Sequence, residues 1–155
     1  MKNFLYVMVI FVIAVFAVSC STPAPSPEPD PAPAPQQESF EQVYEAYADT
    51  LILDGALNHT VVRGNTLSEI TQAEYGENNL YYFPLIMLAS QTAGISDPDL
   101  IMPGMELTIP DLSTNLNNPG SRSQIKSFLE KIAGVYDRKN QAATAQNLRD
   151  LAATL

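Results

Sequence analysis

The sequence has one cysteine, Cys20, one histidine, His59, and no tryptophan. A single cysteine excludes an intrachain disulfide. His59 opens a β-branched stretch and has no evident serine or cysteine partner, so we interpret it as a structural residue. These scarcities exclude a disulfide-stabilised fold and leave no pattern typical of histidine-dependent nucleophilic catalysis.

Basic residues are also scarce through most of the chain. Between Ser21 and Gly120, Arg63 is the single base against fourteen acidic residues, whereas the segment after Gly120 has six bases and three acids. Such an acidic chain is repelled by phosphate backbones, so we expect no nucleic-acid partner. Solvated surfaces and attraction between neighbouring elements are enough to explain the asymmetry.

The sequence contains no Gly-rich phosphate loop and no cluster of metal ligands, so we expect neither a cofactor nor a metal. Asp97 and Asp99 are a carboxylate pair of the kind that a glycosidase uses. They flank Pro98, however, and turn chemistry explains both without catalysis. We therefore expect that the protein is not an enzyme.

One long apolar run is present, from Phe4 to Val18. As a helix it would rise about 22 Å, short of the roughly 30 Å hydrocarbon core, so it is typical of a signal peptide. The residues 17–20, Ala-Val-Ser-Cys, resemble a bacterial lipobox, with alanine where leucine is usual. The resemblance implies cleavage after residue 19 and acylation of Cys20. An ordinary cleavage site and an uncleaved anchor are the alternatives.

Residues 20–37 have proline at every second position from 23 to 35. Alternating proline forbids a helix and favours extended polyproline II, so we expect a disordered linker that reaches roughly 50 Å. An SH3-type ligand is the alternative interpretation. The linker predicts that the rest of the chain is held away from a membrane surface.

The segment 58–112 predicts two strands with two helices between them. Thr66 and Glu69 form a T-x-x-E capping box, Gly76 offers a left-handed end to the first helix, and Pro84 suits the first turn of the second. The strands can then pair antiparallel with both helices on one face. The expected elements are a strand from His59 to Arg63, helices from Leu67 to Tyr75 and from Phe83 to about Gln91, and a strand from Glu106 to Ile109.

Three motifs of this segment resemble the LysM family, a module that binds N-acetylglucosamine-containing glycans such as peptidoglycan. They are HTVVRGNTLSEI from His59, the Tyr75-Gly76 pair, and DPDLIMPGMELTIP from Asp97. The resemblance implies a shallow groove between two loops. By position, its residues would be Gly64, Asn65, Thr66 and Leu67 in the first loop and Thr92, Ala93, Gly94, Ile95 and Ser96 in the second.

The sequence departs from the family at Asn65, where aspartate is usual, and at Ser90, where asparagine is usual. Tyr81 and Tyr82 are the aromatic residues that can stack on a sugar, although both types are more often packing residues. A helix cap alone also explains the polar residues of the first loop.

Amphipathic helices are expected on both sides of this segment. Ser39 and Gln42 form a capping box for a helix that ends before Gly55. Residues 113–120 predict a polar loop, Ser121 and Gln124 cap a helix to about Arg138, and a last helix follows a turn at residues 139–140. We expect these helices to pack over Leu85 and Leu88 of the central segment. Binding of a protein partner or self-association is the alternative.

The fold class expected is α+β, a small βααβ LysM module with flanking α-helices. The function expected is peptidoglycan binding by a lipid-anchored protein of the bacterial cell envelope, at the outer membrane or its periplasmic face. The alternatives are a scaffold without sugar affinity and an accessory subunit of a wall hydrolase. The expected boundaries are 1–19 signal peptide, 20–37 lipidated cysteine and linker, 38–57 flanking helix, 58–112 LysM domain, and 113–155 loop and helical hairpin.

Overall fold

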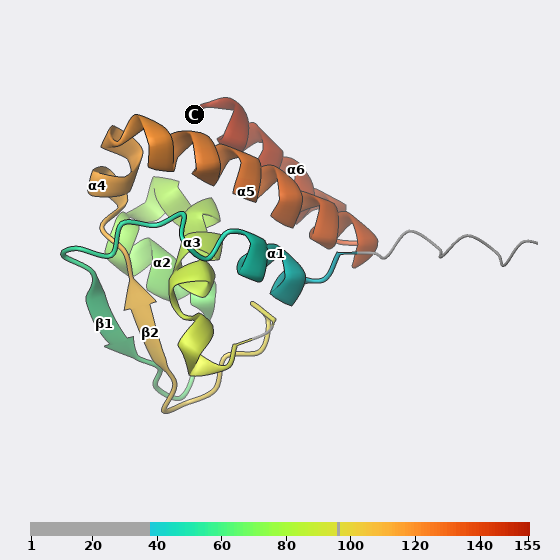
Figure 1. The fold of residues 1–155 in the computed structure, drawn as a ribbon. Helices are drawn as coiled ribbons and strands as arrows, with labels where there is room; N and C mark the ends of the chain where they lie inside the picture. The colour runs from blue at the N-terminus through green and yellow to red at the C-terminus, as the bar shows by residue number, and fades with distance from the viewer. Residues whose placement is uncertain (1–37, 96) are drawn as a thin grey trace, which may run out of the picture. The chain divides into compact units, whose positions relative to one another are not determined.

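The computed structural model describes residues 38–95 and 97–155, so the predicted signal peptide, the predicted lipidation site Cys20, the predicted linker and Ser96 lie outside the described residues. The described part is α+β, with helices around one two-stranded antiparallel sheet (Figure 1). The elements are α1 (Phe40–Ala46), β1 (Leu57–Thr60), α2 (Leu67–Tyr75), the 3-10 helix η1 (Glu77–Tyr82), α3 (Phe83–Ala89), the 3-10 helix η2 (Gln91–Ala93), β2 (Glu106–Ile109), α4 (Leu112–Asn117), α5 (Pro119–Arg138) and α6 (Ala142–Ala153).

Strand β2 has the predicted bounds, whereas β1 begins and ends earlier than predicted. Leu57 pairs with Ile109, and Thr60 pairs with Glu106. Val61 still exchanges backbone hydrogen bonds with the 104–105 turn, but the Val62 N–H donates to Asn65 Oδ1 at 3.0 Å. Together with the bond from the Asn65 N–H to Val62 O, this side-chain bond closes a turn that follows the strand.

Helix α2 confirms the predicted bounds and capping box. Thr66 Oγ1 accepts from the Glu69 N–H at 3.2 Å, and Glu69 Oε2 accepts from the Thr66 N–H at 3.0 Å. Gly76 has φ +90° and ψ 159°, a positive φ but an extended rather than left-handed conformation. The chain then enters η1, which the sequence did not predict.

Helix α3 starts where predicted and ends two residues early, at Ala89. The Ser90 hydroxyl accepts from the Thr108 N–H at 2.8 Å and ties the end of α3 to β2. Ser90 is 1% exposed. The residue that departs from the family pattern therefore holds the helix to the sheet.

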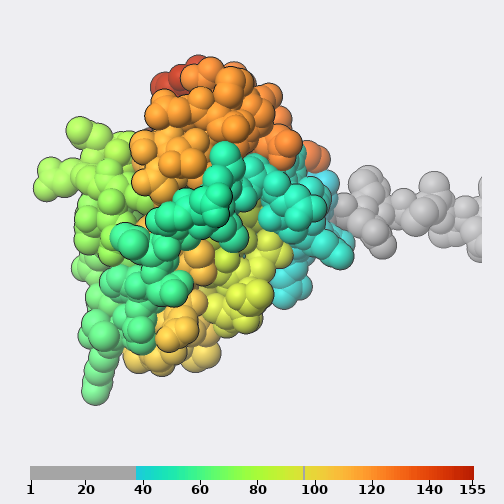
Figure 2. Space-filling view, turned by 60° about the vertical axis from the view of Figure 1, so that its left-hand side comes forward, coloured from blue at the N-terminus to red at the C-terminus, as the bar shows by residue number. Residues whose placement is uncertain are grey.

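Helix α1 starts with the predicted capping box of Ser39 and Gln42, and it ends before Gly55 as predicted, already at Ala46. The segment that follows crosses the surface beside α4 and the start of α5 (Figure 2). Besides the turn bonds from Thr50 N–H to Tyr47 O and from Ala56 N–H to Leu53 O, its backbone bonds to side chains of those helices.

The polar loop predicted for residues 113–120 is wrong. Asp111 caps α4, and Asn118 Oδ1 accepts from the Gly120 and Ser121 N–H groups, so α5 begins at Pro119. Ser121 is consequently inside the helix and does not cap it with Gln124. Its hydroxyl oxygen lies 2.9 Å from Asn115 Oδ1 and 3.2 Å from Thr50 O, so its one proton is shared between these two acceptors.

Of the flanking helices, α5 packs against α3 as predicted. Leu85 is fully buried, and Leu88 is 3% exposed. The Phe83 ring lies 6.0 Å from the Tyr136 ring of α5, edge to face, and α6 buries its own apolar face within the same core. The apolar stripes of the terminal helices are therefore covered within the chain. No helix of the described residues has the length and apolar character needed to cross a bilayer.

The core contains one hydroxyl without a hydrogen-bond partner among the described residues, that of Tyr44, which is 2% exposed. Burial, and then the neighbouring Tyr136 and the carboxylates Asp97 and Asp99, raise the pKa of Tyr44 above its usual value. An unpartnered buried hydroxyl costs folding free energy. Tyr44 is therefore a position where removal of a polar atom is tolerated.

We predict that Tyr44→Phe keeps or raises the free energy of unfolding at pH 7, by up to about 1 kcal/mol. A tyrosine whose pKa is raised by folding stabilises the fold below its unfolded pKa, near 10, and that contribution is lost as pH rises further. The variant should therefore lose less stability than the parent above pH 10. Urea unfolding at pH 7 and at higher pH measures both effects.

Tyr75→Phe is the matched control. The Tyr75 hydroxyl donates to Pro110 O at 2.8 Å, so this variant should lose about 1 kcal/mol at pH 7. Equal losses in the two variants would contradict the assignment of Tyr44.

Candidate functional site

The first predicted loop uses its polar side chains to shape the backbone. Asn65 holds the Val62 N–H, and Thr66 caps α2. Gly64 has φ +96°, a conformation that favours glycine. Leu67, which is 6% exposed, is the residue of this loop that lines a cleft.

The second predicted loop is divided between two other hollows. Thr92 and Ala93 line one with the 102–106 turn, and Gly94 and Ile95 line another with Tyr44 and Glu41. The structure does not bring these four residues together with Leu67 in one cleft. The residues that line the same cleft as Leu67 come later in the chain, at Pro98 and Asp99.

We call this hollow the Leu67 cleft. Its volume is about 180 Å³, and five parts of the chain form it: the start of α2, η1, the start of α3, the turn at residues 98–99, and the end of α5 with the start of α6. Its lining residues are Leu67, Ser68, Leu80, Tyr81, Phe83, Pro98, Asp99, Tyr136, Gln141 and Thr144.

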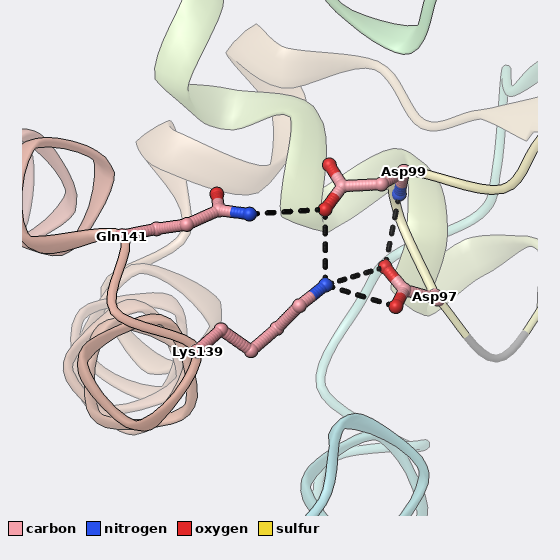
Figure 3. Close-up of polar contacts among 4 residues, drawn as sticks. All are labelled: Asp97, Asp99, Lys139 and Gln141. Carbon is pink, nitrogen blue, oxygen red and sulfur yellow. Dashed lines mark hydrogen bonds and ion pairs between the residues drawn. The ribbon is translucent and has the colours of Figure 1, made fainter.

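A lysine holds the turn at one edge of the cleft (Figure 3). Lys139 Nζ lies 2.9 Å from Asp97 Oδ2 and 2.9 Å from Asp99 Oδ2, and Gln141 Nε2 donates to Asp99 Oδ2 at 3.2 Å. The same Nζ lies 5.1 Å from the centre of the Phe40 ring. We call this group the Lys139 clamp.

The charges within the Lys139 clamp are mutually compensated. Burial lowers the pKa of Lys139, but hydrogen bonds to Asp97 and Asp99 outweigh this effect and raise it above its usual value. Asp97 Oδ1 also accepts from the Asp99 N–H at 3.0 Å, which is the turn chemistry expected of an Asp-Pro-Asp sequence. The Asp97 carboxylate therefore accepts hydrogen bonds from the turn and from Lys139, and the Asp99 carboxylate accepts one from Lys139. Among residues 38–95 and 97–155, no cluster of three or more possible ligands is arranged to hold a metal.

The two tyrosines that were candidates for sugar stacking have different positions. Tyr82 is 5% exposed and belongs to the core, whereas Tyr81 lines the cleft. Asn147 Nδ2 of α6 donates to the Tyr81 hydroxyl at 2.6 Å. Helix α6 therefore fixes the orientation of the Tyr81 ring in the cleft.

His59 lies in β1, away from the cleft residues. Its Nδ1 is 3.5 Å from Glu74 Oε1 of α2, and its Nε2 is buried without a hydrogen-bond partner among the described residues. This position joins the sheet to α2 and agrees with the interpretation of His59 as structural.

The cleft combines apolar and aromatic walls with a carboxylate, an amide and the hydroxyls of Ser68 and Thr144. Such a surface suits a small neutral ligand that has both an apolar face and several hydroxyl or amide groups. Sequence reasoning missed Ser68, Gln141 and Thr144, because no local pattern indicates that α6 approaches α2. No family model, no curated protein and no solved structure matches the chain.

Proposed function

We propose that this protein is a non-enzymatic, lipid-anchored glycan-binding protein of the bacterial envelope, and that it binds N-acetylglucosamine-containing glycans such as peptidoglycan. The observation that carries the proposal is the Leu67 cleft, where the start of α2 meets the turn at Pro98 and Asp99. Both of these segments belong to motifs that resemble the LysM family. The order β1, α2, α3, β2 and the antiparallel sheet are compatible with that resemblance.

The two departures from the family pattern do not argue against sugar binding. Asn65 retains an oxygen that closes the first loop, and Ser90 is buried against β2, away from any ligand. Both residues are thus accounted for by the fold. Neither Asn65 nor Ser90 lines the Leu67 cleft.

A single shallow cleft binds weakly, and a dissociation constant near 1 mM corresponds to only about 4 kcal/mol. A lipid anchor at Cys20, proposed from the lipobox resemblance, would hold the cleft beside a dense repeating glycan. High local concentration then compensates for weak intrinsic affinity. The proposed role is a link between membrane and cell wall.

We predict that Ser68→Arg weakens binding to peptidoglycan at least about tenfold. Ser68 is exposed on α2 and lines the cleft, so an arginine there fills the cleft without disturbing the cap or the core. Arginine is also a better helix former than serine. Co-sedimentation of the full chain, purified in mild detergent, with insoluble peptidoglycan should show at least about a tenfold loss of affinity, or 1.4 kcal/mol.

Ser123→Arg is the matched control. Ser123 is an exposed serine of α5, outside the lining of the cleft, and its substitution adds the same charge. It should pellet like the parent. Equal pelleting of both variants would show that the binding surface lies outside the Leu67 cleft. If the parent does not pellet, the scaffold alternative is favoured.

A further inference from the structure

Leu57 is an apolar residue on the core side of the sheet that the protein leaves uncovered. It pairs directly with Ile109, so the two side chains lie on the same face of the sheet. Ile109 is buried, whereas Leu57 is 61% exposed. The helices that cover this face therefore stop short of the first residue of β1.

A groove lies beside Leu57, formed by the start of β1, the end of α2, the end of β2 and α4. Its volume is about 630 Å³, above the roughly 300 Å³ at which ligand pockets begin. Leu57, Tyr75 and Ile109 give it apolar walls. Two hydrogen bonds hold this wall in place: the Tyr75 hydroxyl donates to Pro110 O at 2.8 Å, and Asn79 Nδ2 donates to Tyr75 O at 2.6 Å. We call this hollow the Leu57 groove.

The Leu57 groove carries negative charge. Glu74 and Asp111 contribute carboxylates, and no lysine or arginine of the described residues lines it. A hydrogen bond from the Thr114 N–H holds the pKa of the Asp111 carboxyl below its usual value, so this group is ionised at neutral pH. Asp54, next to the lining residue Gly55, is exposed and makes no ion pair among the described residues. Charge complementarity therefore calls for a basic partner.

Strand β1 also offers a free backbone edge at this groove (Figure 1). Among residues 38–95 and 97–155 the sheet has two strands, so one side of β1 has no strand beside it. Val61 directs its N–H and C=O toward the 104–105 turn, and these directions alternate along a strand. Asn58 and Thr60 therefore direct their N–H and C=O groups away from β2. Such an edge can accept an extended chain as a further strand.

We propose that the Leu57 groove and the free edge of β1 together dock a basic, extended segment of a partner protein. The segment pairs with Asn58 and Thr60, and one of its apolar side chains enters the groove against Leu57. Its basic side chains lie near Glu74 and Asp111. The Leu57 groove shares no lining residue with the Leu67 cleft, so the proposal does not depend on glycan binding.

Charge and chain chemistry argue against other occupants. A second copy of this chain would bring two acidic grooves together, and each chain has a formal net charge of −9. Residues 21–37 of the same chain contain Glu28 and Asp30 but no base, and their prolines lack the N–H that a strand donates. An anionic membrane surface would also be repelled. A basic segment of another protein satisfies both the charge and the backbone edge.

The test uses the full chain in mild non-ionic detergent and a short capped peptide of alternating lysine and valine, with binding followed by fluorescence anisotropy. This peptide should bind, and its affinity should fall as the salt concentration rises. A peptide of alternating glutamate and valine should bind at least about tenfold more weakly. Methylation of the backbone nitrogens of the lysine–valine peptide removes its strand donors, and it should weaken binding to a similar extent.

Leu57→Lys should weaken binding of the lysine–valine peptide at least about tenfold, because it removes the apolar contact and adds a like charge. Leu100→Lys is the matched control. Leu100 is another exposed leucine and lies outside the lining of the groove, so the same change there should leave binding unchanged. Circular dichroism checks that both variants are folded.

Four results would overturn the proposal. They are failure of the lysine–valine peptide to bind the parent, equal binding by the parent and Leu57→Lys, equal binding of the glutamate–valine peptide, and undiminished binding of the methylated peptide. A dimer of the parent that Leu57→Lys abolishes, measured by analytical ultracentrifugation, would assign the groove to a second copy and overturn it as well.

Discussion

Residues 58–112 expressed alone should melt far below the full chain. Of the buried apolar core residues, 13 of 25 lie outside this segment, in α1, α5 and α6. Without them, Phe83, Leu85 and Leu88 of α3 lose much of their cover, at about 1.5–3 kcal/mol each. The sum is comparable with the whole stability of a small domain, about 5–15 kcal/mol.

The expected fall in melting temperature is at least about 20 °C, because each kcal/mol shifts a domain of this size by roughly 4–8 °C. Thermal unfolding followed by circular dichroism measures it. A chain of residues 38–155, which keeps every described element, should melt like the full chain. Equal melting temperatures for residues 58–112 and 38–155 would show that residues 58–112 fold independently and that the flanking helices do not stabilise them.

Asn115→Ala should be among the most destabilising single substitutions, at about 3–4 kcal/mol. Asn115 is fully buried, and its amide makes four hydrogen bonds. Oδ1 accepts from the Ile52 N–H and the Ser121 hydroxyl, and Nδ2 donates to Ile52 O and Asp111 O. Alanine would leave several of these groups without partners inside the protein.

Urea unfolding of the variant and of Asn117→Ala tests this assignment. Asn117 is an exposed residue of the same helix, so its substitution should change the free energy of unfolding by no more than about 0.5 kcal/mol. Similar losses in both variants would mean that the effect belongs to the helix α4 and not to the Asn115 bonds.

The cleft owes its shape to these long-range contacts as well. Asn115 and Ser121 hold the segment after α1 against α4 and α5, and Lys139, which directly follows α5, binds the turn at Asp97 and Asp99. Stability of the helical layer and geometry of the candidate site are therefore coupled. Destabilised variants should be checked for folding before a loss of binding is interpreted.

The sequence by itself determined the elements whose signals are local. The capping boxes at Ser39 and Thr66 join residues three positions apart, and the apolar period of α5 repeats within one helix. Strand β2 and the bounds of α2 were also predicted correctly. Such signals act between near neighbours, so they can be recognised without knowing where the rest of the chain lies.

Tertiary structure alone decided the path of the segment after α1 and the walls of the cleft, whereas the caps of α4 and α5 at Asp111 and Asn118 are local signals that sequence reasoning missed. The bonds responsible join residues far apart in the chain, such as Ile52 to Asn115, 63 positions on, and Thr50 to Ser121, 71 positions on. An asparagine satisfied by a distant backbone has the same sequence signature as one in a polar loop. Gln141 was missing from the predicted site for the same reason. Its hydrogen bond to Asp99 can form only when α5 and α6 have packed against the rest of the chain.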